Sequence, residues 1–239
     1  MKAILADLKD ANLQRSVAQT MVLVRARDWV SGAMVDEMSQ GFEHCLDLVV
    51  ALGGLGERDA GASAKLEKVF VGEIKDGNGL ALTHGLVLAN IDPKKREAVL
   101  RRLLTNLDQI GDCRHGWLIL TGLSNAYALV PPISKDLVKL VEDPDPKVSR
   151  GSLWLLESAG LSVRGIAPAI IRFMRGKGDD DRRADAAYAL SLIADYSQLA
   201  ELEKALKEES SPKVRKNLKA TINYIRSFES VTWYGSPEW

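Results

Sequence analysis

The chain has 239 residues, of which 46% are hydrophobic and 27% are charged, as in an ordinary globular protein. A chain of this composition can bury a sizeable core, which excludes intrinsic disorder as its general state. It carries 32 Lys and Arg against 32 Asp and Glu. Proteins that hold the phosphates of a nucleic acid usually carry a marked basic excess, so the balanced charge argues against nucleic acid as a partner.

The N-terminal segment does not have the pattern of a secretory signal, because Asp7, Lys9 and Asp10 interrupt its apolar run. No stretch approaches the roughly 18 uninterrupted apolar residues of a membrane span. The two cysteines, Cys45 and Cys113, lie far apart in apolar helical patterns, which favours buried thiols over a disulfide or a metal pair. We therefore expect a cytoplasmic protein that needs no cofactor.

Three apolar segments in the first half of the chain predict helices: Cys45–Leu52, Leu80–Leu88 and Cys113–Leu120. The first ends in the glycine-rich run 53–56, which is a natural helix stop. The other two share a His-Gly dipeptide, repeated after 31 residues at His84 and His115. These features indicate an early, degenerate repeat.

The second half contains a clearer repeat, because three segments can be superposed: Pro146–Leu156, Asp181–Leu190 and Pro212–Ile222. Val148, Arg182 and Val214 then occupy one position, 34 and 32 residues apart. This spacing is the period of a two-helix repeat.

An acidic or proline-containing turn precedes each of these segments, at 142–146, 178–181 and 208–212. Asp and Ser can cap the free N–H groups of the next helix, and Pro fits its first turn. A shorter segment with apolar residues three and four apart lies before each turn, around Leu137, Ile170 and Leu202. The repeating unit is therefore predicted to be helix, turn, helix.

The second segments resemble the HEAT repeat, particularly its short bacterial form related to phycobilin lyases. The matching residues are Asp181, Arg183, Ala186, Ala187, Ala189 and Leu190 in one copy, and Val214, Arg215, Leu218 and Ile222 in the last. The copy at Val148 departs from the pattern, with Ser149 in place of the arginine and Arg150 after it. The resemblance covers about residues 134–227.

The resemblance implies an all-α fold, a right-handed superhelix of about five helix pairs and an N-terminal helix. We expect a single domain over residues 1–230, with degenerate repeats over 1–133 and clear repeats over 134–227. One helix pair cannot bury its apolar face alone, and stacked pairs share a continuous core. Alanines such as Ala187 are expected to let the helices approach closely.

The candidate chemical groups favour structural roles over catalysis. The histidines at positions 44, 84 and 115 are expected to be satisfied and partly buried instead of binding a metal, and none precedes a Glu as in the HEAT-fold deoxyhypusine hydroxylases. The acids of the turns at 143–145 and 179–181 are expected to cap helices instead of binding Ca²⁺. No motif of a metalloprotease, zinc site or phosphate loop is present.

Arginines recur near the start of the second helices, at Arg150, Arg183 and Arg215. They either pair with the acidic turns or form a basic stripe for an acidic peptide or a phosphate. Aromatic residues recur on the same helices, at Trp117, Trp154 and Tyr188. They either fill the core or anchor a partner on the concave face, and we expect at least one to be exposed.

The last nine residues, 231–239, include three aromatic side chains that a partner could contact: Trp233, Tyr234 and Trp239. This tail either folds back over the terminal repeat or contacts another chain. If it is a cap, its deletion should lower the melting temperature.

These observations predict a non-enzymatic scaffold that holds a protein or peptide on its concave face. The candidate face comprises His84, His115, Trp117, Arg150, Trp154, Arg183, Tyr188 and Arg215. One alternative is a HEAT-like DNA glycosylase, in which Trp117, Trp154 and Asp185 would act at the lesion. Another is a chromophore-carrier binding protein similar to the phycobilin lyases.

Overall fold

A computed structural model describes residues 60–110 and 129–229. Every regular element in these two ranges is a helix, and no strand occurs in them, so the described part of the chain is all-α. The chain divides into two compact units, residues 1–133 (unit 1) and 134–239 (unit 2). The boundary lies where the clear sequence repeats begin. The helices expected at Cys45–Leu52 and Cys113–Leu120 lie outside the described residues.

The described part of unit 1 contains, in chain order, α5 (Ala60–Asp76), α6 (Leu80–Ile91), α7 (Arg96–Thr105), α8 (Leu107–Ile110) and the 3-10 turn η2 (Pro131–Ile133). α6 is the helix expected at Leu80–Leu88. It is buried from Ala81 to Ile91 because α5 packs on it from one side and α7 from another. Gly77, with φ of 67°, closes the turn between α5 and α6 in a conformation that favours glycine.

Gly85 determines how closely α5 and α6 approach. A Cβ atom at this position would lie 2.7 Å from the ring of Phe70 on α5 and 3.3 Å from the side chain of Leu103 on α7. Both of these side chains are fully buried. The glycine of the first His-Gly dipeptide therefore provides space for the core of unit 1.

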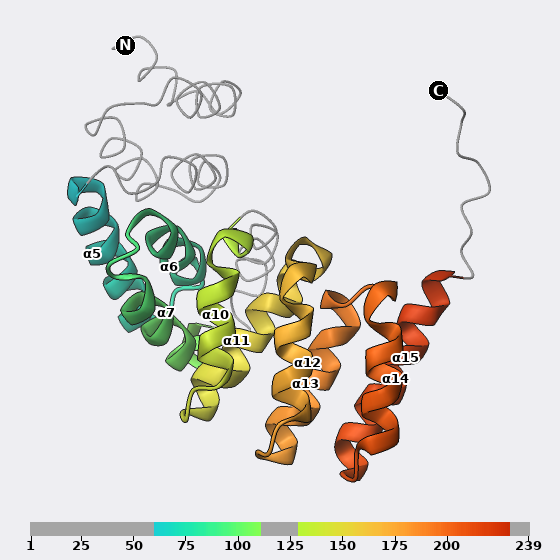
Figure 1. The fold of residues 1–239 in the computed structure, drawn as a ribbon. Coiled ribbons are helices and arrows are strands. Elements are labelled where there is room, and N and C mark those ends of the chain that lie inside the picture. Colours follow the sequence, from blue (N-terminus) through green and yellow to red (C-terminus); the bar gives the residue numbers. More distant parts are fainter. Residues whose placement is uncertain (1–59, 111–128, 230–239) are drawn as a thin grey trace, which may run out of the picture. The chain divides into compact units, whose positions relative to one another are not determined.

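Unit 2 contains, in chain order, α10 (Ser134–Val141), α11 (Pro146–Ala159), the 3-10 segment η3 (Gly160–Ile166), α12 (Ala167–Arg175), α13 (Asp180–Ile193), the 3-10 turn η4 (Tyr196–Gln198), α14 (Leu199–Glu208) and α15 (Pro212–Glu229). These are the three helix pairs expected from the repeat, α10 with α11, α12 with α13 and α14 with α15 (Figure 1). The second helices begin within one residue of the predicted positions.

The turns cap these helices largely as the sequence indicates. The Asp145 carboxylate accepts a hydrogen bond from the Lys147 amide (2.9 Å), and Pro146 occupies the first turn of α11. Asp179 accepts from the amides of Asp181 (2.7 Å) and Arg182 (3.1 Å) at the start of α13. The third turn differs, because the hydroxyl of Ser211 has no partner among the described residues.

In that third turn the side chain of Glu209 accepts a hydrogen bond from the Ser211 amide at 2.8 Å. Arg215 on α15 donates to the carbonyl oxygens of Leu206 (2.8 Å) and Glu209 (2.9 Å) at the end of α14. The guanidinium thereby satisfies carbonyl groups that the helix end leaves free.

Successive pairs are joined mainly through their second helices, since α11 packs on α13 and α13 packs on α15. The side of α13 in these contacts is built of small residues, and Ala184, Ala186, Ala187 and Ala189 are all buried. Alanines leave the backbone accessible, so Asn217 of α15 donates to the Ala184 carbonyl (2.8 Å) and Thr221 donates to that of Ala187 (2.6 Å). The predicted close approach of these helices is confirmed.

Arg182 joins the first two pairs of unit 2. It replaces the buried valine found at the equivalent positions 148 and 214. Its guanidinium lies over the Phe173 ring, 5.6 Å from the centroid, and donates to the carbonyl oxygens of Val141 (2.9 Å) and Asp143 (2.7 Å). An arginine at the repeat position of a buried valine is thus accommodated because backbone oxygens satisfy its donors.

The stretch Pro146–Arg175 is long and apolar enough, by length and composition, to cross a membrane. It comprises α11, η3 and α12 and is not one continuous helix. Gly160 has a φ of 55°, and Val163 departs from helical geometry (φ −111°, ψ 16°). Its apolar side chains instead form part of the core of unit 2, where Leu155, Leu156 and Ile170 are fully buried.

Candidate binding hollow on the second helices

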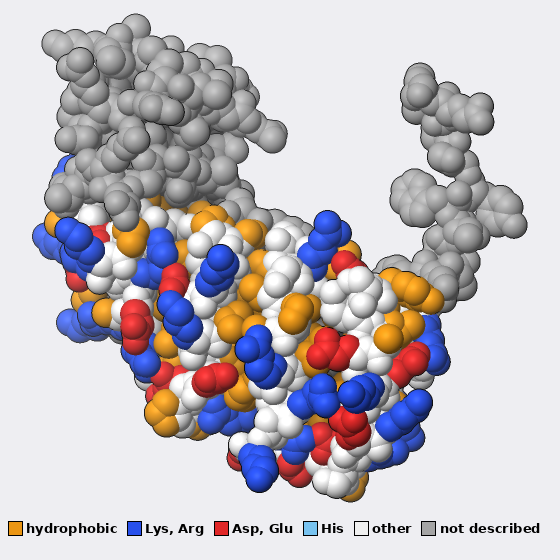
Figure 2. All heavy atoms as spheres, viewed as in Figure 1, with side chains coloured by type: hydrophobic (Ala, Val, Ile, Leu, Met, Phe, Trp, Pro, Cys, Tyr) orange, Lys and Arg blue, Asp and Glu red, His pale blue; other side chains and the backbone are white. Residues whose placement is uncertain are grey.

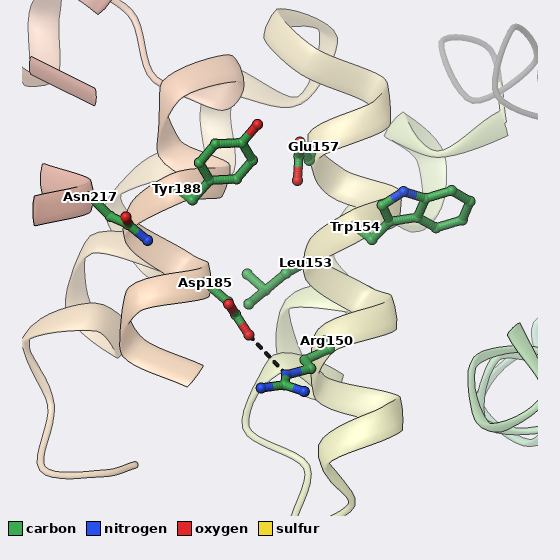
Figure 3. A pocket seen from close by; sticks show the side chains of 7 residues that line it. All are labelled: Arg150, Leu153, Trp154, Glu157, Asp185, Tyr188 and Asn217. Carbon is green, nitrogen blue, oxygen red and sulfur yellow. Dashed lines mark hydrogen bonds and ion pairs between the residues drawn. The ribbon is translucent and has the colours of Figure 1, made fainter. Parts of the chain in front are cut away.

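The second helices of unit 2 share a shallow hollow of about 310 Å³ (Figure 3). Its lining residues are Arg150, Leu153, Trp154 and Glu157 of α11, Asp185 and Tyr188 of α13, and Asn217 of α15. The hollow is therefore a property of stacked helix pairs, because no single pair supplies its walls.

Helical spacing places these side chains on one surface. Arg150, Trp154 and Glu157 are separated by four and three residues along α11, and Asp185 and Tyr188 by three along α13. Trp154 and Tyr188 are 34 residues apart and occupy equivalent repeat positions. The same face of each second helix therefore contributes to the hollow.

The charged groups of the hollow differ in whether they have a partner. Arg150 donates from Nε to the Asp185 carboxylate at 2.9 Å, joining α11 to α13 across the hollow (Figure 3). Glu157 has no hydrogen-bond or ion-pair partner among the described residues. Burial raises the pKa of the Glu157 carboxyl above its ordinary value, and the negative charge of Asp185 raises it further. The hollow therefore contains one carboxylate whose charge is not compensated.

The aromatic side chains of the hollow are available to solvent to different degrees. Tyr188 is 54% exposed, which confirms that at least one of the three aromatic residues is exposed, and its ring projects toward the side of Glu157 (Figure 3). Trp154 is half-buried and its indole points away from Tyr188. Leu153 is buried and points from α11 toward α13. The hollow thus combines an apolar floor with an exposed ring.

The other two arginines of the sequence prediction lie elsewhere. Arg183 donates to the Met174 carbonyl (2.7 Å), to Asp180 (2.9 Å) and to the nearly buried carboxylate of Glu209. Arg215 is bound to carbonyl oxygens at the end of α14. The sequence left two roles open for these arginines, pairing within the fold or a basic stripe for a partner. The contacts of Arg183 and Arg215 are of the first kind. Only Arg150 of the three lies in the hollow.

A second hollow, of about 320 Å³, lies at the turn between α12 and α13. Its charged lining residues are Glu142, Arg172, Lys177, Asp179, Arg182 and Arg183. Arg172 and Lys177 have no partner among the described residues, so this hollow has the opposite charge imbalance. Over the face of unit 2 visible in Figure 2, basic and acidic side chains are interspersed.

The remaining predicted residues are not brought to the hollow. His84 lies on α6 of unit 1, where it is buried and its Nδ1 lies 2.6 Å from the Glu73 carboxylate. The satisfied histidine expected from the sequence is thus paired at Nδ1, whereas its Nε2 has no partner among the described residues. Further predicted residues lie outside the described ranges, namely His44, His115 and Trp117, and in the tail Trp233, Tyr234 and Trp239.

Three residues of the hollow were not predicted from the sequence to bind a partner, namely Leu153, Glu157 and Asn217. Glu157 could have been found, because it lies one turn after Trp154 on the same helical face. Leu153 and Asn217 carry no such signal, since their part in the hollow depends on how α11, α13 and α15 pack.

No protein-family model matches the chain, and no curated protein matches its sequence.

Proposed function

We propose that this chain is a non-enzymatic interaction module, an α-solenoid of HEAT-like helix pairs that binds a protein or peptide on its second helices. The repeat period of 34 and 32 residues in unit 2 supports the solenoid, as does the packing of α11 on α13 and of α13 on α15. Stacked pairs of this kind present an extended concave surface suited to a partner chain.

The observation that carries this proposal is the hollow between α11, α13 and α15. Tyr188 offers an exposed aromatic ring on a rigid helix, and such rings bind a partner with little loss of conformational entropy. Arg150 and Asp185 surround it with polar groups that can fix the orientation of a bound segment. An apolar floor with a polar rim is the usual composition of a protein-binding site.

Two tyrosines provide a matched pair for testing the proposal, since Tyr188 and Tyr196 are both 54% exposed. Only Tyr188 lines the hollow. The full chain and its Tyr188→Lys and Tyr196→Lys variants should be used as bait in cell extract, with bound proteins identified by mass spectrometry.

We expect to capture a partner that binds the unaltered chain and the Tyr196→Lys variant but not the Tyr188→Lys variant. The interaction should then be measured with the purified partner by calorimetry, where Tyr188→Lys should weaken binding by about tenfold or more. Equal binding by both variants would contradict the proposed face. Salt-dependent binding of a DNA oligomer, or a visible absorption band on mixing with a bilin, would favour one of the two alternative functions.

A further inference from the structure

When Glu157 is ionised, the described residues that line the hollow on the second helices carry one negative charge in excess. The other two ionisable groups among them, Arg150 and Asp185, neutralise one another at 2.9 Å. Glu157 has no partner among the described residues. The nearby ammonium group of Lys213 does not compensate it, because Lys213 lies 2.6 Å from the carboxylate of Asp181. A guest that carries a positive charge would therefore compensate the charge of Glu157.

We propose that this hollow receives a cationic side chain, an arginine or a lysine, of the bound partner. Glu157 would accept its hydrogen bonds and the Tyr188 ring would stack on the cation. Leu153 offers an apolar surface for the aliphatic part of such a side chain. This inference rests on the proposed function, because it names the chemistry that the partner presents to the same face.

The composition of the hollow favours a cation over a neutral or acidic guest. Burial and the charge of Asp185 both disfavour the ionised form of Glu157, and the opposite charge of a bound cation would stabilise that form. An acidic guest would instead lie against the carboxylates of Asp185 and Glu157, and would have for binding the guanidinium N–H groups of Arg150 that Asp185 does not use. The second hollow, where Arg172 and Lys177 have no partner among the described residues, would have the opposite preference and serves as an internal comparison.

The probes for the test are three small amides of equal backbone: N-acetyl-arginine amide, its neutral analogue N-acetyl-citrulline amide and N-acetyl-glutamate amide. Each is titrated into the full chain at pH 7, and NMR follows the side-chain resonances of Glu157 and Tyr188. The arginine probe should cause saturable shifts with a Kd on the order of millimolar, as expected for one side chain. The citrulline probe should bind roughly fivefold more weakly or not at all.

Two variants with equal charge change complete the test. Glu157→Gln should abolish the preference for arginine over citrulline. Glu142→Gln, which removes a carboxylate from the second hollow, should preserve it. Equal affinity for arginine and citrulline, a preference retained in Glu157→Gln, shifts caused by the glutamate probe, or no saturable shift with arginine would each overturn the inference.

The melting temperature of the Glu157→Gln variant distinguishes loss of binding from loss of folding. Because the folded pKa of Glu157 is raised above the ordinary value of 4.5, its ionised form destabilises the folded state once the pH rises past that value. Glu157→Gln should therefore melt at the same or a higher temperature than the unaltered chain at pH 7, while losing the arginine preference. A lower melting temperature would instead give Glu157 a structural role and overturn its assignment to a guest.

The experiments distinguish failure of the cationic guest from failure of the proposed binding face. A partner lost by Tyr188→Lys but bound equally by Glu157→Gln would overturn the cationic guest and leave the proposed binding face intact. Specific arginine binding in the hollow without any partner sensitive to Tyr188→Lys would support the subsite and contradict the proposed function.

Discussion

Replacing Arg183 with methionine should destabilise unit 2 strongly, because this guanidinium joins two successive helix pairs. It binds the end of α12 through the Met174 carbonyl and the start of α13 through Asp180. It also forms an ion pair with Glu209 in the turn before α15. The Arg183 side chain is 13% exposed and that of Glu209 only 6%, so neither charge can be hydrated fully if its partner is removed.

Removing one partner of a buried ion pair typically costs about 3–5 kcal/mol, because the other charge is left without compensation. Some compensation persists here, since Glu209 also accepts from the Ser211 amide at 2.8 Å. We therefore expect the lower end of this range, about 3 kcal/mol, for Arg183→Met. With an m-value of about 1–3 kcal/mol per molar urea, the unfolding midpoint monitored by circular dichroism should fall by roughly 1–3 M.

An exposed ion pair between the same two helix pairs provides the control. Arg175 of α12 donates to Glu208 of α14 at 2.7 Å, with side chains that are 37% and 51% exposed. Arg175→Met should cost less than about 1 kcal/mol. The double variant Arg183→Met/Glu209→Gln should be less destabilised than the sum of its two single variants. Equal effects of Arg183→Met and Arg175→Met would refute the reasoning from burial.

Three further changes test the packing and capping of unit 2 by thermal or urea unfolding. Ala187→Asp should cost more than about 3 kcal/mol, because position 187 is fully buried, whereas Ala200→Asp on the exposed side of α14 should be tolerated. Thr221→Val should cost about 1 kcal/mol by removing the 2.6 Å hydrogen bond to the Ala187 carbonyl, and an unchanged midpoint would show that this bond contributes nothing. Asp179→Ala should lower the melting temperature at pH 7 through loss of the α13 cap. Hydrogen bonds from the Arg182 and Asp181 amides hold the pKa of Asp179 below its ordinary value of 3.8. The difference in melting temperature between Asp179→Ala and the unaltered chain should therefore shrink as the pH falls below 3.8. A difference that stays constant would contradict this assignment.

The repeat in unit 2 could be predicted from the sequence because each of its signals is local. Pro146 and Asp179 start helices through their own backbone geometry and side-chain oxygens. The apolar residues around Leu137, Ile170 and Leu202 lie on one stripe whatever the helix packs against, and all three are buried. The described part of unit 1 was less regular in sequence.

The partners of charged side chains could not be predicted in the same way, because they lie a full repeat away. Arg150 pairs with Asp185 after 35 residues and Lys213 with Asp181 after 32. From the sequence, Arg150 and Arg183 were equally good candidates for a basic stripe that binds a partner. Burial against Glu209 gave Arg183 a structural role, while the exposed position of Arg150 placed it in the hollow.

The sequence by itself determined the all-α character of the described residues, the positions of the helix pairs in unit 2 and the face of α11 that carries Trp154. These follow from helical periodicity and from capping, which act over a few residues. Only the tertiary structure decided that Glu157 and Tyr188 share one hollow and that no described residue pairs with Glu157. Contacts between stacked helices depend on the packing of side chains from different repeats, which no local pattern specifies.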